Sequence, residues 1–268
     1  MTSTEAVDTG VQPSAFLDSS ILVSLFQFWD ACRQGNIPLD QAPNRGEQLL
    51  EVLASTGVAT DALDVSDAED AMRGRRSFQS LNASGTSYSY FSSQVCWAEV
   101  HHVLLEARGL ERLVHQLVPY SLRMKRPQLV YRRSLRESDY VELETKMEEF
   151  RDTLKMDYSI DVIDVDNPAA GYDITHDDIW NSARAIWSHI LMGVMDAYVC
   201  AAAIRVRADI FISSDGPLRG VLKQLRDPNS EQTSAVASLK QALGMETLAE
   251  FPEALGPGQP LTSSASLP

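Results

Sequence analysis

The segment FLDSSILVSLF, residues 16–26, places a carboxylate, Asp18, in a run that otherwise consists of apolar residues and serine. The apolar residues before Asp18 predict a buried strand at about 15–19, and the apolar spacing from Ile21 to Trp29 predicts a helix directly after it. Burying a carboxylate without a partner costs several kcal/mol. Asp18 therefore needs a compensating group, either the start of the helix, which it could cap, or a cation.

The composition is that of an ordinary globular protein: 268 residues, 44% hydrophobic and 22% charged. The net charge of −14 argues against a general nucleic-acid coat protein, because phosphate binding uses basic surface. No apolar run reaches the roughly 18–20 residues of a membrane span, and the opening MTSTEAVDTG lacks a secretory signal, so we expect a cytoplasmic protein without membrane contact. Three cysteines without CxxC spacing predict reduced, mostly buried thiols.

Strand and helix patterns alternate along the chain. SIDVIDV at 159–165 and ADIFIS at 208–213 predict two further buried strands. Helices are expected at about 93–108, where Gly109 would stop the helix, at 175–189 behind a capping box, and from about Asp196. This order predicts an α/β fold, a parallel sheet with covering helices.

Four acids stand in apolar surroundings, two at strand ends and two near helix starts: Asp18, Glu99, Asp196 and Asp215. A parallel sheet could bring all four to one edge. At about 4 Å each pair of charges would repel by roughly 4 kcal/mol at an effective dielectric of 20. A hard divalent ion, Mg²⁺ or Mn²⁺, relieves this repulsion, and such an ion can activate water for phosphodiester hydrolysis.

Four motifs in order resemble those of the PIN-domain nucleases, which include the VapC-type toxin ribonucleases: FLDSS, SQVCWAE, MDAYVCAAAI and ADIFISSDGPL. The resemblance implies a three-layer α/β/α sandwich with a central parallel sheet. It also implies that Asp18, Glu99, Asp196 and Asp215 bind metal and are catalytic, and that Ser213 orients Asp215 or a water.

The resemblance divides the chain into three parts. A disordered N-terminus is expected at 1–12, a PIN-like domain at 13–226, and a C-terminal helical segment with a flexible tail at 227–268, the tail from about Pro252. The PIN-like domain would carry insertions at about 30–92, with one short amphipathic segment near 46–55, and at 110–157.

Each acid also has a purely structural explanation. Asp18 could cap a helix, Glu99 could be a solvated helix residue, Asp196 could pair with Arg205, and Asp215 could be a turn residue before Gly216. The joint occurrence of the four acids in family order is the reason to prefer a site.

A basic segment, YSLRMKRPQLVYRRSLR at 120–136, contains no acid. It could clamp an RNA backbone through Arg126, Arg132 and Arg133, with Tyr120 or Tyr131 stacking on a base. Alternatively, it is a helical surface that the acidic stretch 137–152 neutralises.

The resemblance implies a metal-dependent endoribonuclease that cleaves RNA phosphodiester bonds by metal-activated water. The alternatives are a non-catalytic PIN-like module that binds RNA or a protein, and a structure-specific DNA nuclease. RNA is the expected partner, and the family also allows an antitoxin or other protein inhibitor and a homodimer. DVDNP at 164–168 resembles the start of haloacid-dehalogenase phosphatases, but Pro168 stands where these have Thr or Val.

Overall fold

The computed structural model describes residues 12–43, 45–55, 68–69, 71–76, 79, 88–116, 132, 134–171, 173–190, 192–227, 234–245, 252–256 and 259. Within them five parallel strands form one sheet, in the order β3-β2-β1-β4-β5. The strands are β1 (Ser14–Leu17), β2 (Ser89–Ser92), β3 (Val162–Asp164), β4 (Ile210–Ile212) and β5 (Glu253–Leu255). The predicted α/β class with a parallel sheet is confirmed.

The centre of the sheet is apolar on both faces, as a covered parallel sheet requires. Phe16 on β1 lies opposite Phe91 on β2 and Phe211 on β4. The rings of Phe16 and Phe211 stack with centroids 5.8 Å apart, and both side chains are fully buried. These pairs fix the register that aligns the carboxyl ends of β1 and β4.

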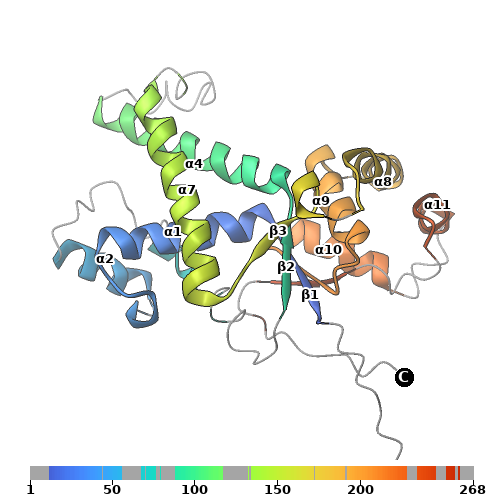
Figure 1. Cartoon of the computed structure of the whole chain (residues 1–268), viewed down its shortest axis with the longest axis horizontal. Helices are drawn as coiled ribbons and strands as arrows, with labels where there is room; N and C mark the ends of the chain where they lie inside the picture. Colours follow the sequence, from blue (N-terminus) through green and yellow to red (C-terminus); the bar gives the residue numbers. More distant parts are fainter. Residues whose placement is uncertain are drawn as a thin grey trace, which may run out of the picture.

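Helices cover both faces of the sheet. In Figure 1, α1, α4 and α7 pack against one another on one side of the strands, whereas α8, α9 and α10 lie on the other side. The helices are α1 (Ser19–Gln34), α2 (Gly46–Ser55), α4 (Gln94–His115), α7 (Glu137–Tyr158), α8 (His176–His189), α9 (Val194–Arg205), α10 (Gly216–Arg226) and α11 (Ser234–Leu243). This arrangement is compatible with a three-layer α/β/α architecture.

The direction of chain winding reverses between β1 and β4. From β1 the chain proceeds outward to β2 and β3, and then crosses to β4 and β5 on the other side of β1. Right-handed crossovers place the connecting helices of the two halves on opposite faces of the sheet. In open α/β sheets, binding sites form beyond the carboxyl ends of the strands at such a reversal. Asp18 follows β1 at this point.

Three expectations about element boundaries are corrected. β2 lies at the end of the stretch 30–92 that was expected to be an insertion, and β5 lies in the segment from Pro252 that was expected to be a flexible tail. These strands have 4 and 3 residues, too few for an alternating pattern to stand out. α4 continues through Gly109 because Arg108 and Arg112, on either side of it, pair with acids of α7.

Other predicted boundaries are confirmed. Thr175 and Asp178 form the capping box of α8: the Thr175 hydroxyl accepts from the Asp178 N–H at 3.2 Å, and the Asp178 carboxylate accepts from the Thr175 N–H at 3.0 Å. The amphipathic segment near 46–55 is α2. α9 is buried from Ala197 to Ile204, since it lies between the sheet and α8.

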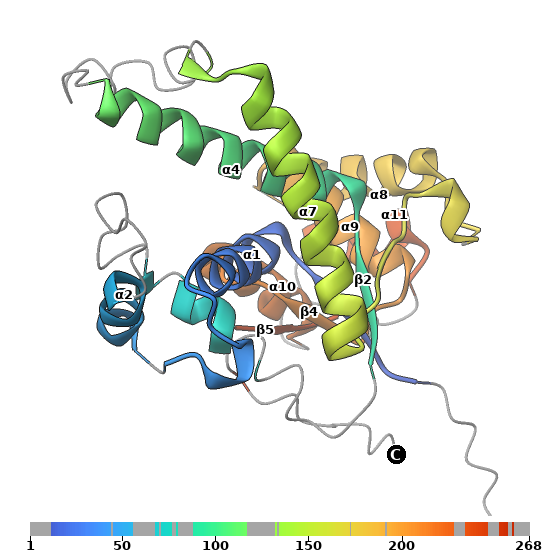
Figure 2. The ribbon, with the colours of Figure 1, turned by 60° about the vertical axis from the view of Figure 1, so that its left-hand side comes forward.

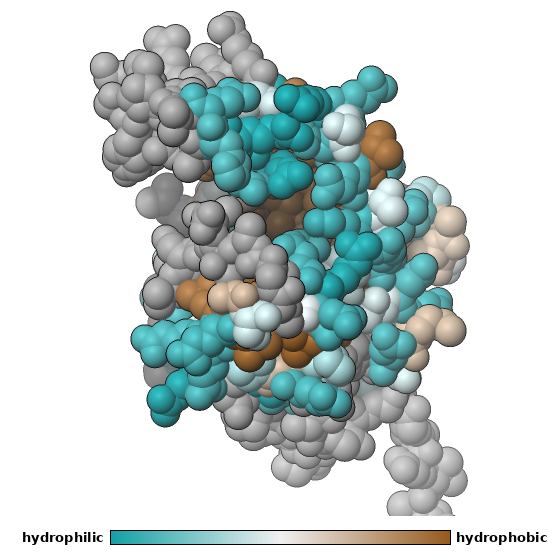
Figure 3. All heavy atoms as spheres, turned by 90° about the vertical axis from the view of Figure 1, so that its left-hand side faces the viewer, coloured by the Kyte–Doolittle hydropathy of each residue, from teal (hydrophilic) through white to brown (hydrophobic). Residues whose placement is uncertain are grey.

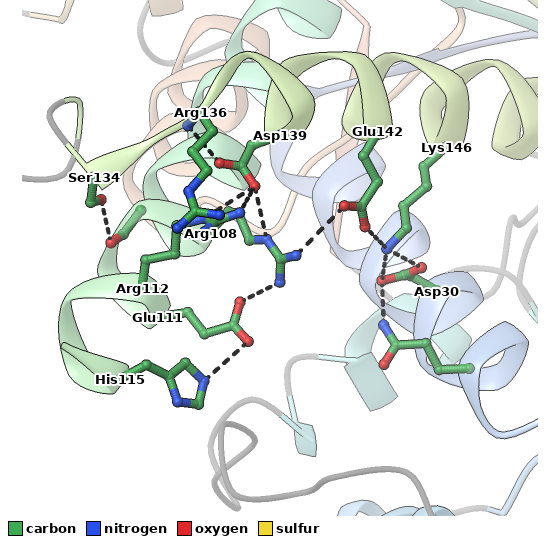
Figure 4. A network of polar contacts seen from close by, with 12 residues as sticks. Asp30, Arg108, Glu111, Arg112, His115, Ser134, Arg136, Asp139, Glu142 and Lys146 are labelled. Carbon is green, nitrogen blue, oxygen red and sulfur yellow. Dashed lines mark hydrogen bonds and ion pairs between the residues drawn. The ribbon is translucent and has the colours of Figure 1, made fainter.

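The long helices α4 and α7 form an arm that projects from the rest of the structure (Figure 2). Ion pairs connect the two helices near the outer end (Figure 4). The carboxylate of Asp139 on α7 pairs with Arg112 on α4, and it lies 3.6 Å from the Nε of Arg108. Arg108 also contacts Glu142 at 3.5 Å, and Lys146 connects α7 to Asp30 of α1 at 3.2 Å. The arm is therefore held to α1 as well as within itself.

Asp139 also begins α7. Its carboxylate accepts a hydrogen bond from the Arg136 backbone N–H at 2.7 Å, as in a capping box. Burial alone would raise the pKa of Asp139, but hydrogen bonds from Arg112 and Arg136 and the charges of Arg112 and Arg108 lower it below its usual value. Asp139 thus remains charged at neutral pH.

The surface on the side of α1, α2 and α7 is mostly hydrophilic, with smaller hydrophobic areas between the polar ones (Figure 3). Within the described residues, none of the helices combines the length and hydropathy that a bilayer crossing requires.

Candidate functional site

All four predicted acids are described, and they gather around the carboxyl ends of β1 and β4. Asp18 directly follows β1, and its N–H donates to the Ile212 carbonyl of β4 at 3.1 Å. Asp215 lies just after β4 at the start of α10, Asp196 is in the first turn of α9, and Glu99 is in the second turn of α4. α1 and α10 start at the carboxyl ends of β1 and β4, the strands at the reversal, and α4 starts at the end of the neighbouring β2. Residues distant in sequence can therefore meet there.

Asp18 is held by the serines around it. Its side chain is buried, and Oδ1 accepts from the Ser19 backbone N–H at 2.8 Å, which makes Asp18 the N-cap of α1. Oδ2 accepts from the hydroxyls of Ser20 at 2.7 Å and Ser213 at 2.6 Å. Three of the roughly four acceptor positions of a carboxylate are therefore occupied, so the orientation of Asp18 is fixed.

A hydroxyl connects Glu99 to this group. Ser19 Oγ donates to Glu99 Oε2 at 2.8 Å, while the backbone N–H of the same serine binds Asp18. Ser19 thus sits between the two carboxylates. Glu99 itself is exposed, so its side chain borders the solvent-facing side of the cluster.

The charges of two other members of the cluster act on Asp196. Burial raises the pKa of Asp196, the negative charges of Asp215 and Asp18 raise it further, and a hydrogen bond from the Gly193 N–H lowers it. An added Cβ at Gly193 would lie 2.8 Å from Asp196 Oδ2, so the Asp196 carboxylate would have to move. The net direction is upward, which means that the folded protein disfavours a negative charge at Asp196.

Asp215 caps α10, its Oδ1 accepting from the Leu218 N–H at 3.0 Å. The predicted contact between Ser213 and Asp215 exists, but through the backbone: the Asp215 N–H donates to Ser213 Oγ at 2.9 Å. The hydroxyl proton of Ser213 goes to Asp18. Ser213 therefore positions Asp18 and the turn that carries Asp215, and the Asp215 carboxylate is not its hydrogen-bond partner.

No basic side chain neutralises the cluster within the described residues, where none of the four carboxylates has an ion pair with Lys, Arg or His. The suggested pairing of Asp196 with Arg205 does not occur, since Arg205 Nε donates to Ser182 Oγ at 2.7 Å. The predicted cap at Asp18 is confirmed, and Asp215, for which a turn was suggested, also caps a helix. A cap satisfies hydrogen bonds and leaves the net negative charge of the group in place.

The donor set fits a hard divalent cation, because every donor is a carboxylate or hydroxyl oxygen. In the described part of the chain, no three or more His, Cys, Asp and Glu side chains are already placed tightly enough to hold a metal ion.

Comparisons with known proteins give no match: no family model, no curated protein and no solved structure is significantly similar to this chain.

Two buried thiols lie close to the cluster. Burial raises the pKa of Cys96 to about 12, with a further contribution from the charge of Asp18, and burial likewise raises that of Cys200. Both, like Cys32, are free and buried, which confirms the predicted reduced thiols. They are packing residues beneath the carboxylates, not ligands.

The two aspartates of DVDNP have structural partners. Asp164 accepts from Trp97 Nε1 and pairs with Arg151, each at 2.7 Å. Asp166 accepts from the Gln94 N–H at 2.7 Å, which caps the start of α4. This leaves neither carboxylate placed as a nucleophile.

Most of the proposed basic clamp lies outside the described residues, including Arg126, Arg133, Tyr120 and Tyr131. Arg132 is described and exposed. The clamp therefore stays a prediction.

Sequence reasoning overlooked Ser19, Ser20 and Gly193. Both serines stand in the FLDSS motif itself, and a pair of hydroxyls in the first turn after a capping aspartate was the available signal. The role of Gly193 depends on a close approach that only the fold reveals.

Asp196→Asn is expected to stabilise the metal-free protein at neutral pH by up to about 1 kcal/mol, the scale of a partly exposed charge interaction. A folded-state pKa raised above the unfolded value means that stability falls as pH rises through the folded pKa. The advantage of the Asn variant should therefore be present above that pKa and vanish as pH falls below the ordinary Asp value of 3.8. Urea unfolding of both proteins between pH 3.5 and 7.5 measures this difference in stability. An Asn variant that is less stable than the wild type at pH 7 contradicts the prediction.

Proposed function

We propose that the chain has a PIN-like α/β/α fold and is a metal-dependent endoribonuclease. The observation that carries the proposal is the meeting of Asp18, Glu99, Asp196 and Asp215 at the reversal of the sheet, without a neutralising basic side chain among the described residues. Asp18 is buried and Asp196 is half-buried beside the exposed carboxylates of Glu99 and Asp215. Like charges close together repel, and a divalent cation would relieve this repulsion.

In this proposal the four carboxylates hold Mg²⁺ or Mn²⁺. The bound ion would lower the pKa of the attacking water and offset the charge that develops on the phosphodiester. Ser20 and Ser213 keep Asp18 in one orientation, and Ser19 sets the relative position of Asp18 and Glu99. Burial and the charges of Asp215 and Asp18 raise the pKa of Asp196, which would suit it to accept a proton from the water.

The main alternative is a non-catalytic PIN-like module, and the caps at Asp18 and Asp215 give it support, because they provide both residues with a structural role. The nuclease would cleave RNA repeatedly, whereas the non-catalytic module would bind RNA or a protein without cleaving it. A structure-specific DNA nuclease differs from both in substrate.

The test is incubation of the purified protein with a mixed RNA pool and Mn²⁺, followed by sequencing of the new ends, with single-stranded and branched DNA in parallel. Cleavage of RNA by the wild type is expected, with no cleavage in EDTA or by Asp18→Asn. Asp161→Asn is the matched control. Asp161 is exposed, pairs with Lys155, and lies at the amino end of the edge strand β3, whereas the cluster lies at the carboxyl ends of β1 and β4. Equal cleavage by wild type and Asp18→Asn, or none by either, rejects the nuclease.

A further inference from the structure

Some basic side chains of the structure pair with carboxylates, and within the described residues those of α10 do not. Arg33, Arg108, Arg112, Lys146, Arg151 and Lys155 all pair with carboxylates. Arg219, Lys223 and Arg226 have no such partner among the described residues. They are spaced i, i+4 and i+7, so they lie along one face of α10, beside the buried stripe of Leu218, Leu222 and Leu225.

Arg219 is the member next to the carboxylate cluster. Its guanidinium donates to the Ser213 carbonyl at 2.5 Å, and the hydroxyl of the same serine holds Asp18. Ser213 thus connects the carboxylates to the first cation of the α10 face.

Lys223 and Arg226 continue away from the cluster along a groove of about 560 Å³ between α10 and the edge strand β5. Figure 2 shows α10 next to β4 and β5. The three cations span about 10.5 Å along the helix axis, at 1.5 Å per residue. Asp227, which directly follows Arg226, and Glu253 also line the groove, so two acids lie beside Lys223 and Arg226 there.

We propose that this face of α10, the strip formed by Arg219, Lys223 and Arg226, binds the backbone phosphates of single-stranded RNA and leads the strand to the carboxylate cluster. The proposal rests on the proposed function for its choice of RNA. A phosphodiester approaching four carboxylates on a chain of net charge −14 needs local cations. Guanidinium groups suit phosphate oxygens because they can bind two at once.

The test measures binding of a fluorescent single-stranded RNA in EDTA, so that no cleavage is required, from 50 to 200 mM salt. Each phosphate contact adds about 0.7 to the slope of log affinity against log salt. The triple variant Arg219→Ala, Lys223→Ala, Arg226→Ala should have a slope shallower by about 2, so that across this range the wild type loses about 20-fold more affinity than the variant. The double variant Lys223→Ala, Arg226→Ala keeps the Ser213 contact. Its slope should change by about two thirds as much as that of the triple variant.

Two sets of variants isolate the position of the charges. Arg45→Ala, Lys155→Ala, Arg184→Ala removes three exposed cations elsewhere and should keep the wild-type slope. Exchange of Arg219 and Arg226 for Lys, and of Lys223 for Arg, keeps the three charges and should give the wild-type slope. Equal slopes for the strip and control variants, or no salt-dependent binding by the wild type, overturn the proposal. If instead only Arg132→Ala, Arg133→Ala flattens the slope, the basic segment at 120–136 is the RNA contact and the strip is rejected.

The binding test of the strip and the cleavage test of the nuclease can fail separately. A wild type that binds through the strip but does not cleave in Mn²⁺ removes the proposed nuclease and leaves the strip as an RNA-binding surface. A wild type that cleaves with unchanged slopes in the strip variants removes the strip alone.

Discussion

Asp215→Asn is expected to lower Mn²⁺-dependent RNA cleavage by at least about 100-fold while leaving the metal-free protein as stable as the wild type or more stable. Loss of groups that merely support metal ligands already costs about 10–100-fold, so loss of a ligand should cost more. Stability should survive because Asn caps a helix as well as Asp does, and the cap to the Leu218 N–H can be kept. The Asn variant also removes the charge that acts on Asp196.

Asp215→Ala is the informative companion. It removes both the charge and the cap, and loss of an N-cap costs about 1 kcal/mol. Cleavage should therefore be lost in both variants, whereas only Ala should lower the urea midpoint. Cleavage rates measured together with urea unfolding in EDTA separate the two effects. If Asn unfolds as readily as Ala, the carboxylate charge is structural and the metal assignment of Asp215 is rejected.

The Asp18 segment shows why sequence and structure agreed on part of the site. An aspartate between a buried strand and a helix could be a cap or a ligand, and the structure gives it the cap together with two serine hydroxyls. The two explanations are compatible, because capping uses one carboxylate oxygen and leaves the charge. Local pattern therefore located the residue, but it could not decide whether other carboxylates surround it.

Convergence of the four acids was predictable only through topology. Strand ends and helix starts are visible in a sequence, and parallel strands bring their carboxyl ends to one edge. The link from Ser19 to Glu99 was not predictable, since Ser19 reaches this residue, 80 positions away, only after α1 and α4 have packed.

β5 was missed for a different physical reason. Its three residues have no periodicity of their own, and it is a strand because β4 offers unpaired backbone groups beside it. It matters to the site because the Leu255 carbonyl accepts from the Ser213 N–H at 3.1 Å. The residue that orients Asp18 is thus fixed by a strand near the end of the chain, a dependence that no local sequence window contains.

Mn²⁺ is expected to stabilise the fold directly, whether or not the protein cleaves RNA. A ligand that binds only the folded state at about 100 times its Kd adds about 2.7 kcal/mol to the free energy of unfolding. Titrating Mn²⁺ during urea unfolding should therefore raise the wild-type midpoint progressively, with this gain reached at about 100 times Kd. Asp18→Asn and Glu99→Gln should lose most of the gain, although each keeps an oxygen that can accept from Ser19, and Asp161→Asn should retain it. A wild-type midpoint that does not respond to Mn²⁺, or an equal response in all three variants, would mean that the carboxylates at the end of β1 do not form a metal site.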